Sequence, residues 1–155
     1  MDHQVHHILV TLTTLVETDM EFPIFLNGVQ DGTITFELVD LGQRQFQIQI
    51  VDGPLVGDCF EDWDYFSALS KLRLKLEEKG LLLGCIGSLE NFYPSNMSLD
   101  MGLGKVGYLM EMGEKSGRSS QARVFDICYD VQKLASVESQ KKYFQMWKDS
   151  LESQL

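Results

Sequence analysis

Two six-residue stretches decide the fold: Thr33-Ile34-Thr35-Phe36-Glu37-Leu38 and Gln45-Phe46-Gln47-Ile48-Gln49-Ile50. Each alternates polar with apolar residues, which is the pattern of a strand with one buried face. Between them Asp40-Leu41-Gly42-Gln43 predicts a compact turn, so the two strands form an antiparallel hairpin. The residues predicted on its core face are Ile34, Phe36, Leu38, Phe46, Ile48 and Ile50. The opposite face carries mainly Thr and Gln and is expected to meet solvent or a partner.

Further strands are predicted on both sides of the hairpin. Residues 7–16 are rich in Ile, Val, Leu and Thr, and residues 22–26 form a short extension that Pro23 would confine to an edge or a loop. Later strands are predicted over 81–86, 105–112 and 122–127. The stretch 87–104, rich in Asn, Ser, Gly and Pro, is predicted to be irregular.

The first of two amphipathic helices is predicted over 61–79. Its N-terminal cap is Asp58, with Glu61 three residues on, or alternatively Asp62. The residues at helical spacing on its apolar stripe are Trp63, Phe66, Leu69, Leu72 and Leu76. The bases in its second half, which suit the helix dipole, are Lys71, Arg73, Lys75 and Lys79. Gly80 is expected to end the helix.

The second helix is predicted over 137–152, with Ser136 as its cap. Its apolar stripe of Val137, Phe144, Trp147 and Leu151 is interrupted only by Gln140. These elements predict a single α+β domain over residues 1–155, a mostly antiparallel sheet of about six strands with both helices packed on one face. The order of the strands does not follow from the sequence.

Composition narrows the class of protein. No apolar run approaches the roughly 18 residues that a membrane span needs, and the N-terminus lacks the basic segment of a secretory signal, so a cytoplasmic location without membrane contact is expected. The three cysteines, Cys59, Cys85 and Cys128, lie far apart and predict neither a disulfide framework nor a metal site. The alternative, a nucleophilic cysteine, would need a nearby histidine, and all the histidines lie within the first seven residues.

Negative charge is concentrated in the first part of the chain. The net charge is −10, and residues 1–70 hold twelve acids against one base, Arg44. Such a field repels nucleic acid and attracts basic surfaces, although general solubility is the plainer explanation. Whether the acids gather on one face depends on tertiary structure.

Two short motifs carry weak chemical signals. His3, His6 and His7 have a spacing that a metal site could use, but a frayed terminus is the default expectation, and no metal or cofactor is predicted. Residues 102–107 match GxGxxG, yet these glycines lead into a predicted strand, whereas a dinucleotide loop leaves a strand and opens a helix.

The 91–104 segment is the strongest candidate for a ligand site. It is long, and its candidate residues offer hydroxyls, an amide and a carboxylate: Tyr93, Ser95, Asn96 and Asp100. No histidine or second carboxylate accompanies them, so no catalytic acid–base pair is predicted. The alternative is a self-packed loop whose hydrogen bonds are internal.

The same segment carries a resemblance. The run Asn91-x-Tyr93-Pro94-Ser95-x-Met97-x-x-Asp100-Met101-Gly102-x-Gly104, followed by Tyr108 and Gly113, resembles a family of small uncharacterised bacterial proteins. Val124-Phe125-Asp126 and the stretch 135–140 extend the likeness over roughly residues 61–152. Proteins of that family look like those encoded beside polymorphic toxins, which implies an immunity-type role.

Three functions are therefore weighed. The first is a non-enzymatic immunity protein that binds a toxin whose surface is basic. Its predicted contact residues are Asp58, Glu61, Asp62 and Asp64. The alternative is that these acids only compensate the dipole of the first helix. The second is a small-molecule-binding or enzymatic domain that uses the 91–104 segment. The third is a scaffold or oligomerisation module whose interface is the Gln and Thr face of the hairpin; the oligomeric state is left open.

Overall fold

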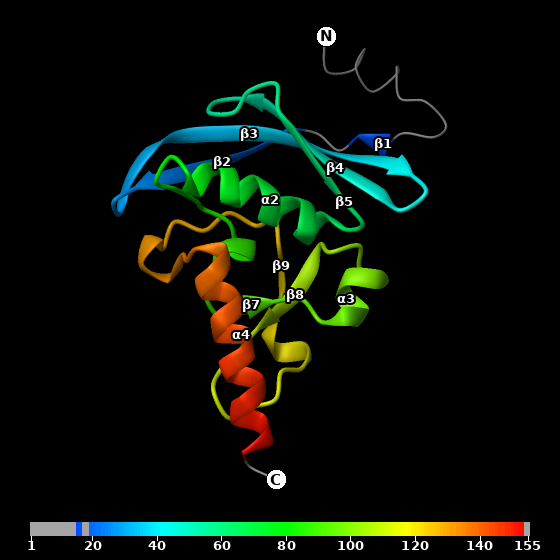
Figure 1. Ribbon diagram of the computed structural model, residues 1–155, viewed down its shortest axis with the longest axis vertical. Helices are drawn as coiled ribbons and strands as arrows, with labels where there is room; N and C mark the ends of the chain where they lie inside the picture. Colours follow the sequence, from blue (N-terminus) through cyan, green and yellow to red (C-terminus); the bar gives the residue numbers. More distant parts are fainter. Residues whose placement is uncertain (1–14, 17–18, 154–155) are drawn as a thin grey trace.

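The computed structural model describes residues 15–16 and 19–153, and over them the predicted α+β class is confirmed (Figure 1). In this part of the chain the strands form two antiparallel sheets, the larger in the order β5-β4-β3-β2-β6 with β1 beside β3, the smaller in the order β7-β8-β9. The larger sheet consists of β1 (Leu15–Val16), β2 (Met20–Leu26), β3 (Val29–Gly42), β4 (Gln45–Asp52), β5 (Cys59–Asp62) and β6 (Leu81–Leu83). The smaller sheet consists of β7 (Phe92–Tyr93), β8 (Val106–Leu109) and β9 (Gln121–Arg123).

Three α-helices and three short 3₁₀ turns complete the described part. The α-helices are α2 (Tyr65–Glu77), α3 (Asn96–Asp100) and α4 (Val137–Glu152). The 3₁₀ turns lie at Ile86–Ser88, Arg118–Ser120 and Val131–Lys133. None of the helices in the described part of the chain is long and apolar enough to cross a bilayer.

The central hairpin is confirmed. β3 pairs with β4, with Leu38 opposite Ile48, and the six residues predicted on its core face are all at most 4% exposed. The turn is tighter than predicted, because β3 continues to Gly42 and only Gln43 and Arg44 lie at the tip. Both tip residues have positive φ, 55° and 60°, which lets a two-residue turn match the twist of the strands.

The prediction that Pro23 confines residues 22–26 to a sheet edge or a loop was wrong. β2 is an inner strand that pairs with β3 on one side and with β6 on the other. Pro23 is tolerated because it lies just before the residues paired with β6, next to a register shift in the pairing with β3. Its carbonyl oxygen still accepts a hydrogen bond from the Gly84 N–H at 2.8 Å. Of the strand predicted over 7–16, only β1 lies within the described residues.

The two main helices occupy different layers, so the prediction that both cover one face of one sheet was wrong. Figure 1 shows α2 between the larger sheet and the smaller one, while α4 lies on the far side of α2, beside β7. α4 begins at Val137 with Ser136 as its cap, as predicted. Its first N–H donates to Glu77 Oε2 at 3.0 Å, which joins the start of α4 to the end of α2.

A buried arginine on α2 forms hydrogen bonds that connect α2 to α4. Arg73 was predicted only as one of the bases in the second half of the first helix, and in the structure it is 2% exposed. Its guanidinium donates to Gln140 Oε1 at 2.7 Å, to the Ala135 carbonyl at 2.8 Å and to the Gly87 carbonyl at 3.2 Å. Burial lowers the pKa of Arg73, because desolvation disfavours the charged form. The polar break that Gln140 makes in the α4 stripe is therefore the partner of a buried cation.

The 87–104 stretch is more ordered than predicted. It holds β7, the short helix α3 and part of the first 3₁₀ turn. The strands predicted over 81–86, 105–112 and 122–127 are present but shorter, because β6, β8 and β9 are only three or four residues long. The glycines of the GxGxxG match do lead into β8. Gly104 has φ 74°, and a Cβ there would lie 2.6 Å from Asp64 Oδ1 and from the Phe66 nitrogen.

Candidate functional site

The four acids proposed for partner binding lie in different places. α2 begins at Tyr65, so Glu61 and Asp62 are not in its first turn; they belong to the edge strand β5, where Gln47 pairs with Glu61. The predicted caps Asp58 and Asp62 were wrong for the same reason. Asp58 precedes β5 and Asp62 ends it, so about 13 Å of extended chain separates these two acids.

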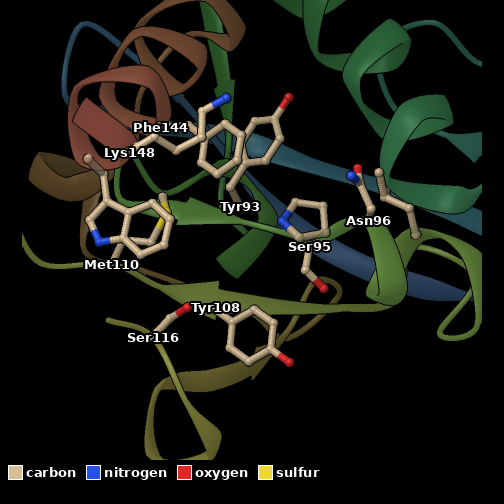
Figure 2. A pocket seen from close by; sticks show the side chains of 11 residues that line it. Tyr93, Ser95, Asn96, Tyr108, Met110, Ser116, Phe144 and Lys148 are labelled. Atoms are coloured by element: carbon tan, nitrogen blue, oxygen red, sulfur yellow. The ribbon is translucent and has the colours of Figure 1, made fainter. Parts of the chain in front are cut away.

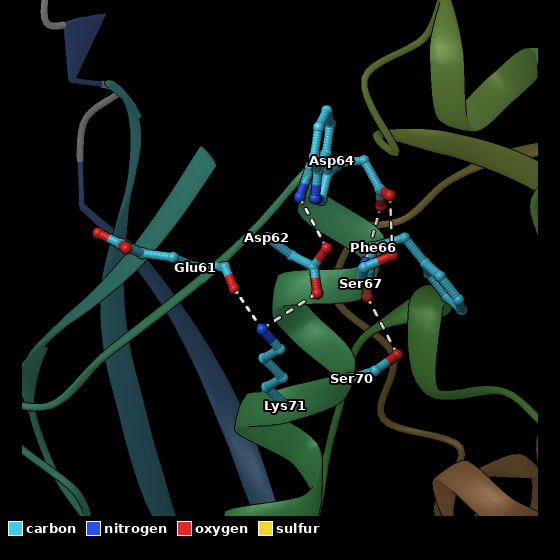
Figure 3. A network of polar contacts seen from close by, with 8 residues as sticks. Glu61, Asp62, Asp64, Phe66, Ser67, Ser70 and Lys71 are labelled. Atoms are coloured by element: carbon cyan, nitrogen blue, oxygen red, sulfur yellow. Dashed lines mark hydrogen bonds and ion pairs between the residues drawn. The ribbon is translucent and has the colours of Figure 1, made fainter. Parts of the chain in front are cut away.

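Asp64 is the real cap of α2. Its Oδ1 accepts from the Ser67 N–H at 2.7 Å and its Oδ2 from the Ser67 hydroxyl at 2.8 Å (Figure 3). The residue is 6% exposed, and the Gly104 backbone packs against it. Because both carboxylate oxygens are occupied inside the fold, Asp64 is removed from the candidate contact surface.

Glu61 and Asp62 form an ordered, accessible pair (Figure 3). Asp62 Oδ2 lies 3.2 Å from Lys71 Nζ, and its Oδ1 accepts from the Trp63 N–H at 2.7 Å. Lys71 also donates to the Glu61 carbonyl at 2.6 Å, while Glu61 Oε1 accepts from Gln47 Nε2 at 2.9 Å. These contacts hold both carboxylates in place at the edge of the larger sheet.

Trp63 lies beside these acids and is 70% exposed. The helical stripe predicted it to be buried. That prediction was wrong, because β5 ends at Asp62 and α2 starts only at Tyr65, so Trp63 belongs to neither element. The indole borders a cavity of about 440 Å³ together with Arg44 at the hairpin tip, Glu61 and Asp62.

Arg44 connects this cavity to the 91–104 segment. Its Nη1 donates to the Asp100 carbonyl at 2.9 Å, and its Nη2 lies 3.4 Å from Asp100 Oδ1. The next residue, Met101, is 77% exposed. We refer to Trp63, Arg44, Glu61, Asp62 and Asp100 as the Trp63 surface. Asp100, predicted with the loop ligand residues, therefore belongs with the acids of the sheet edge.

The other three loop candidates border a second cavity, of about 320 Å³ (Figure 2). Ser95 caps α3, since its Oγ accepts from the Ser98 N–H at 3.0 Å. Tyr93 stacks on Phe144 of α4, with ring centroids 4.1 Å apart, and burial raises the pKa of its hydroxyl. Asn96 lies exposed at the start of α3. The loop therefore has internal hydrogen bonds, as the alternative of a self-packed loop predicted. It also forms one wall of the cavity.

The sequence did not point to the residues that complete this second cavity. Tyr108 comes from β8, and Phe144, Trp147 and Lys148 come from α4. Phe144 and Trp147 were predicted on the apolar stripe of the last helix, but nothing local indicated that this stripe faces the 91–97 segment. Only the pairing of β7 with β8, together with the docking of α4 beside β7, brings the three elements together.

Metal binding receives no support from the described residues, where no group of three or more His, Cys, Asp and Glu side chains could hold an ion. The histidines His3, His6 and His7 lie outside the described residues. Among the cysteines, Cys85 is buried and its thiol pKa is raised by that burial, while Cys59 is exposed. No family model matches the chain, and no curated protein matches it significantly.

Proposed function

We propose that this chain is a non-enzymatic, cytoplasmic protein-binding protein of the immunity type, which neutralises a bacterial toxin by direct contact at the Trp63 surface. The observation that carries the proposal is the exposure of Trp63 between ordered charges. Trp and Arg dominate the binding energy of protein interfaces, because a large rigid side chain buries much area at a small cost in entropy. A partner that covered this indole would remove its apolar surface from water, which favours binding.

Charge supports a basic partner. The chain has a net charge of −10, and at the Trp63 surface the bases Lys71 and Arg44 already contact Asp62 and Asp100. Within residues 15–16 and 19–153, the hydrogen-bond partner of the Glu61 carboxylate is the neutral Gln47 amide. A basic surface is therefore attracted over a long range by the whole chain and over a short range by Glu61, which speeds encounter and orients the partner.

The partner is expected to have an apolar pocket that receives the indole, with Lys or Arg side chains around its rim. The decisive test is calorimetric titration with the protein encoded by the neighbouring reading frame, which we expect to be a toxin. Trp63→Ala should weaken binding by about 2 kcal/mol or more. Met146→Ala, which truncates a 59% exposed side chain on α4, is the matched control and should leave the affinity unchanged.

The charged rim is tested separately by Glu61→Gln and Asp62→Asn, which keep the shape of each side chain. We expect a slower association rate and a weaker dependence on salt, with little change in the dissociation rate. Asp64 is excluded from such variants because its loss would damage α2 directly. A metabolic neighbour in place of a toxin, or full binding by the Trp63→Ala protein, would contradict the proposal.

A further inference from the structure

The second cavity is lined by residues of the 93–99 segment, of β8 and of α4, together with Met110 and Ser116. We call it the aromatic cleft and define it by Tyr93, Pro94, Tyr108, Phe144, Trp147 and Lys148. In Figure 2 the rings of Tyr93 and Phe144 lie face to face, and Tyr108 and Ser116 occupy the opposite wall. Its volume of about 320 Å³ falls at the lower end of the range for small-molecule sites.

The walls of the aromatic cleft are already in position. Tyr93 and Phe144 are nearly parallel, at 7°, and the other neighbour of Tyr93 is Phe66, which meets it edge to face at 5.3 Å. Trp147 continues the row beside Phe144, with 17° between the ring planes. Its indole N–H donates to the Glu114 carbonyl at 2.9 Å, which fixes the orientation of the ring. A ligand would therefore meet rigid aromatic surfaces without having to order them first.

The sign of the charge in the cleft is opposite to that of the whole chain. Lys148 Nζ lies 4.6 Å from the centre of the Phe144 ring and, in the described part of the chain, has no carboxylate within ion-pair distance. Among the residues that the structure describes, no acidic side chain lines the cleft. An aromatic box commonly receives a cation, but here a cation of the chain itself already covers one ring, so a second cation would be repelled.

Polar groups remain available around the apolar walls. Tyr108, Ser116 and Asn96, which carry two hydroxyls and an amide, each line the cleft. Over residues 15–16 and 19–153 none of these three side chains makes a hydrogen bond to the protein. A few polar groups around an aromatic slot are the usual means of orienting a bound small molecule.

We infer that the aromatic cleft binds a small planar aromatic anion, a one- or two-ring carboxylate whose ring lies against Trp147 and Tyr108 and whose charge faces Lys148. An apolar cavity of about 150 Å³ accommodates a single benzene ring, so the volume here suits two fused rings. The inference is independent of the Trp63 surface. Neither Trp63 nor Arg44 lines the cleft.

The chain contains two tryptophans, and this makes a direct test possible. The indole N–H signals of Trp147 and Trp63 are followed by heteronuclear NMR while 2-naphthoate, 2-naphthamide or 2-naphthylmethylammonium is added. These probes share a ring system and carry charges of −1, 0 and +1. We expect 2-naphthoate to shift the Trp147 signal saturably, with a Kd on the order of 1 mM or tighter for a fragment of this size, and to leave Trp63 unmoved.

The variant Lys148→Met keeps the stem of the side chain and removes its charge. It should weaken 2-naphthoate binding about three- to tenfold while leaving 2-naphthamide unchanged, because only the anion loses a Coulombic partner. Lys142→Met, on another face of α4 where Lys142 contacts Glu138, is the matched control and should change neither ligand. Both lysines are exposed, so both variants should fold.

Several outcomes would overturn the inference. One is the cationic probe binding as tightly as the anion, which would make the cleft a cation box. Another is a parallel shift of both tryptophan signals, which would indicate adsorption to the surface in general. A third is 2-naphthoate affinity that Lys148→Met leaves intact, and a fourth is the lack of any saturable Trp147 shift at about ten times the expected Kd.

Discussion

The larger sheet with α2 and the smaller sheet with α4 are stabilised in different ways. The first region buries side chains that alternate along long strands, such as Phe22, Ile34 and Phe36, each at most 1% exposed. In the second region the strands are two to four residues long, and side-chain hydrogen bonds join α4 to the segment that follows β8. Examples are Tyr143, which donates to the Met110 carbonyl at 3.2 Å, and Ser150, whose Oγ accepts from the Gly113 N–H at 2.9 Å.

This difference determines which contacts position the residues of each candidate site. The Trp63 surface lies at the edge of the larger sheet, where strand pairing positions Glu61 and Asp62 and Arg44 contacts Asp100 of α3. The aromatic cleft lies wholly in the second region, and its walls come together only when α4 docks. The Arg73–Gln140 contact holds α4 in place, so we expect the cleft to depend on a polar bond and the Trp63 surface to depend on an apolar core.

The largest effect is expected from Phe36→Ala in the first region. Phe36 is fully buried and stacks on Phe22 with ring centroids 5.0 Å apart. Truncation leaves a cavity, and we expect a loss of about 3–5 kcal/mol in the free energy of unfolding, measured by urea denaturation. A loss below about 1 kcal/mol would show that the apolar core does not dominate this region.

A somewhat smaller effect is expected from Gln140→Ala in the second region. The variant removes the acceptor of Arg73 and the donors to the Gly87 and Leu89 carbonyls. Arg73 keeps the Ala135 and Gly87 carbonyls but loses its shortest hydrogen bond, the Gly87 and Leu89 carbonyls each lose one donor, and a cavity is left, so about 2–4 kcal/mol should be lost. Gln145→Ala, which removes an exposed amide on the same helix, is the control and should stay within about 0.5 kcal/mol. Equal losses in the two variants would contradict the role given to Arg73.

The smallest effects concern the two helix caps. Asp64→Ala should cost about 2 kcal/mol, because Asp64 is buried and the Ser67 N–H and hydroxyl would lose their acceptor away from water. Ser136→Ala at the start of α4 should cost about 1 kcal/mol or less, since that cap is only half-buried and water can replace it. Thermal unfolding of the two variants measures the difference. A larger loss of stability in Ser136→Ala than in Asp64→Ala would mean that α4 depends on its cap more strongly than α2 does.

The regular parts of the fold were predictable from the sequence because their signals are local. Alternation identified the hairpin, and Ser136 marked the start of α4 correctly. Helical spacing gave a wrong prediction at Trp63, because the spacing of the apolar residues extends by chance to a position before the true start of α2. α3 was missed because five residues are too few to show a period.

Long-range contacts decided what the sequence could not predict. The sequence placed Arg73 among several bases in the second half of the helix, and its contact with Gln140, 67 residues away, could not be predicted from that segment alone. Tyr93, Ser95 and Asn96 were recognised as candidates from their own segment, whereas Tyr108 and Lys148 enter the same cleft from other elements. Asp100 was predicted with the loop candidates, and its contact with Arg44 could not be predicted because Arg44 is distant in the sequence.

The tip of the central hairpin has a consequence for how the chain tolerates mutation. Gln43 and Arg44 occupy left-handed backbone conformations that cost a non-glycine residue roughly 1–2 kcal/mol each, and Asn or Gly would relieve most of that cost. Both side chains border the Trp63 cavity, and Arg44 also holds Asp100. Substitutions that make this turn fold more easily therefore remove the contacts that shape the cavity. At these two positions, thermostability and recognition are expected to be in direct competition during evolution.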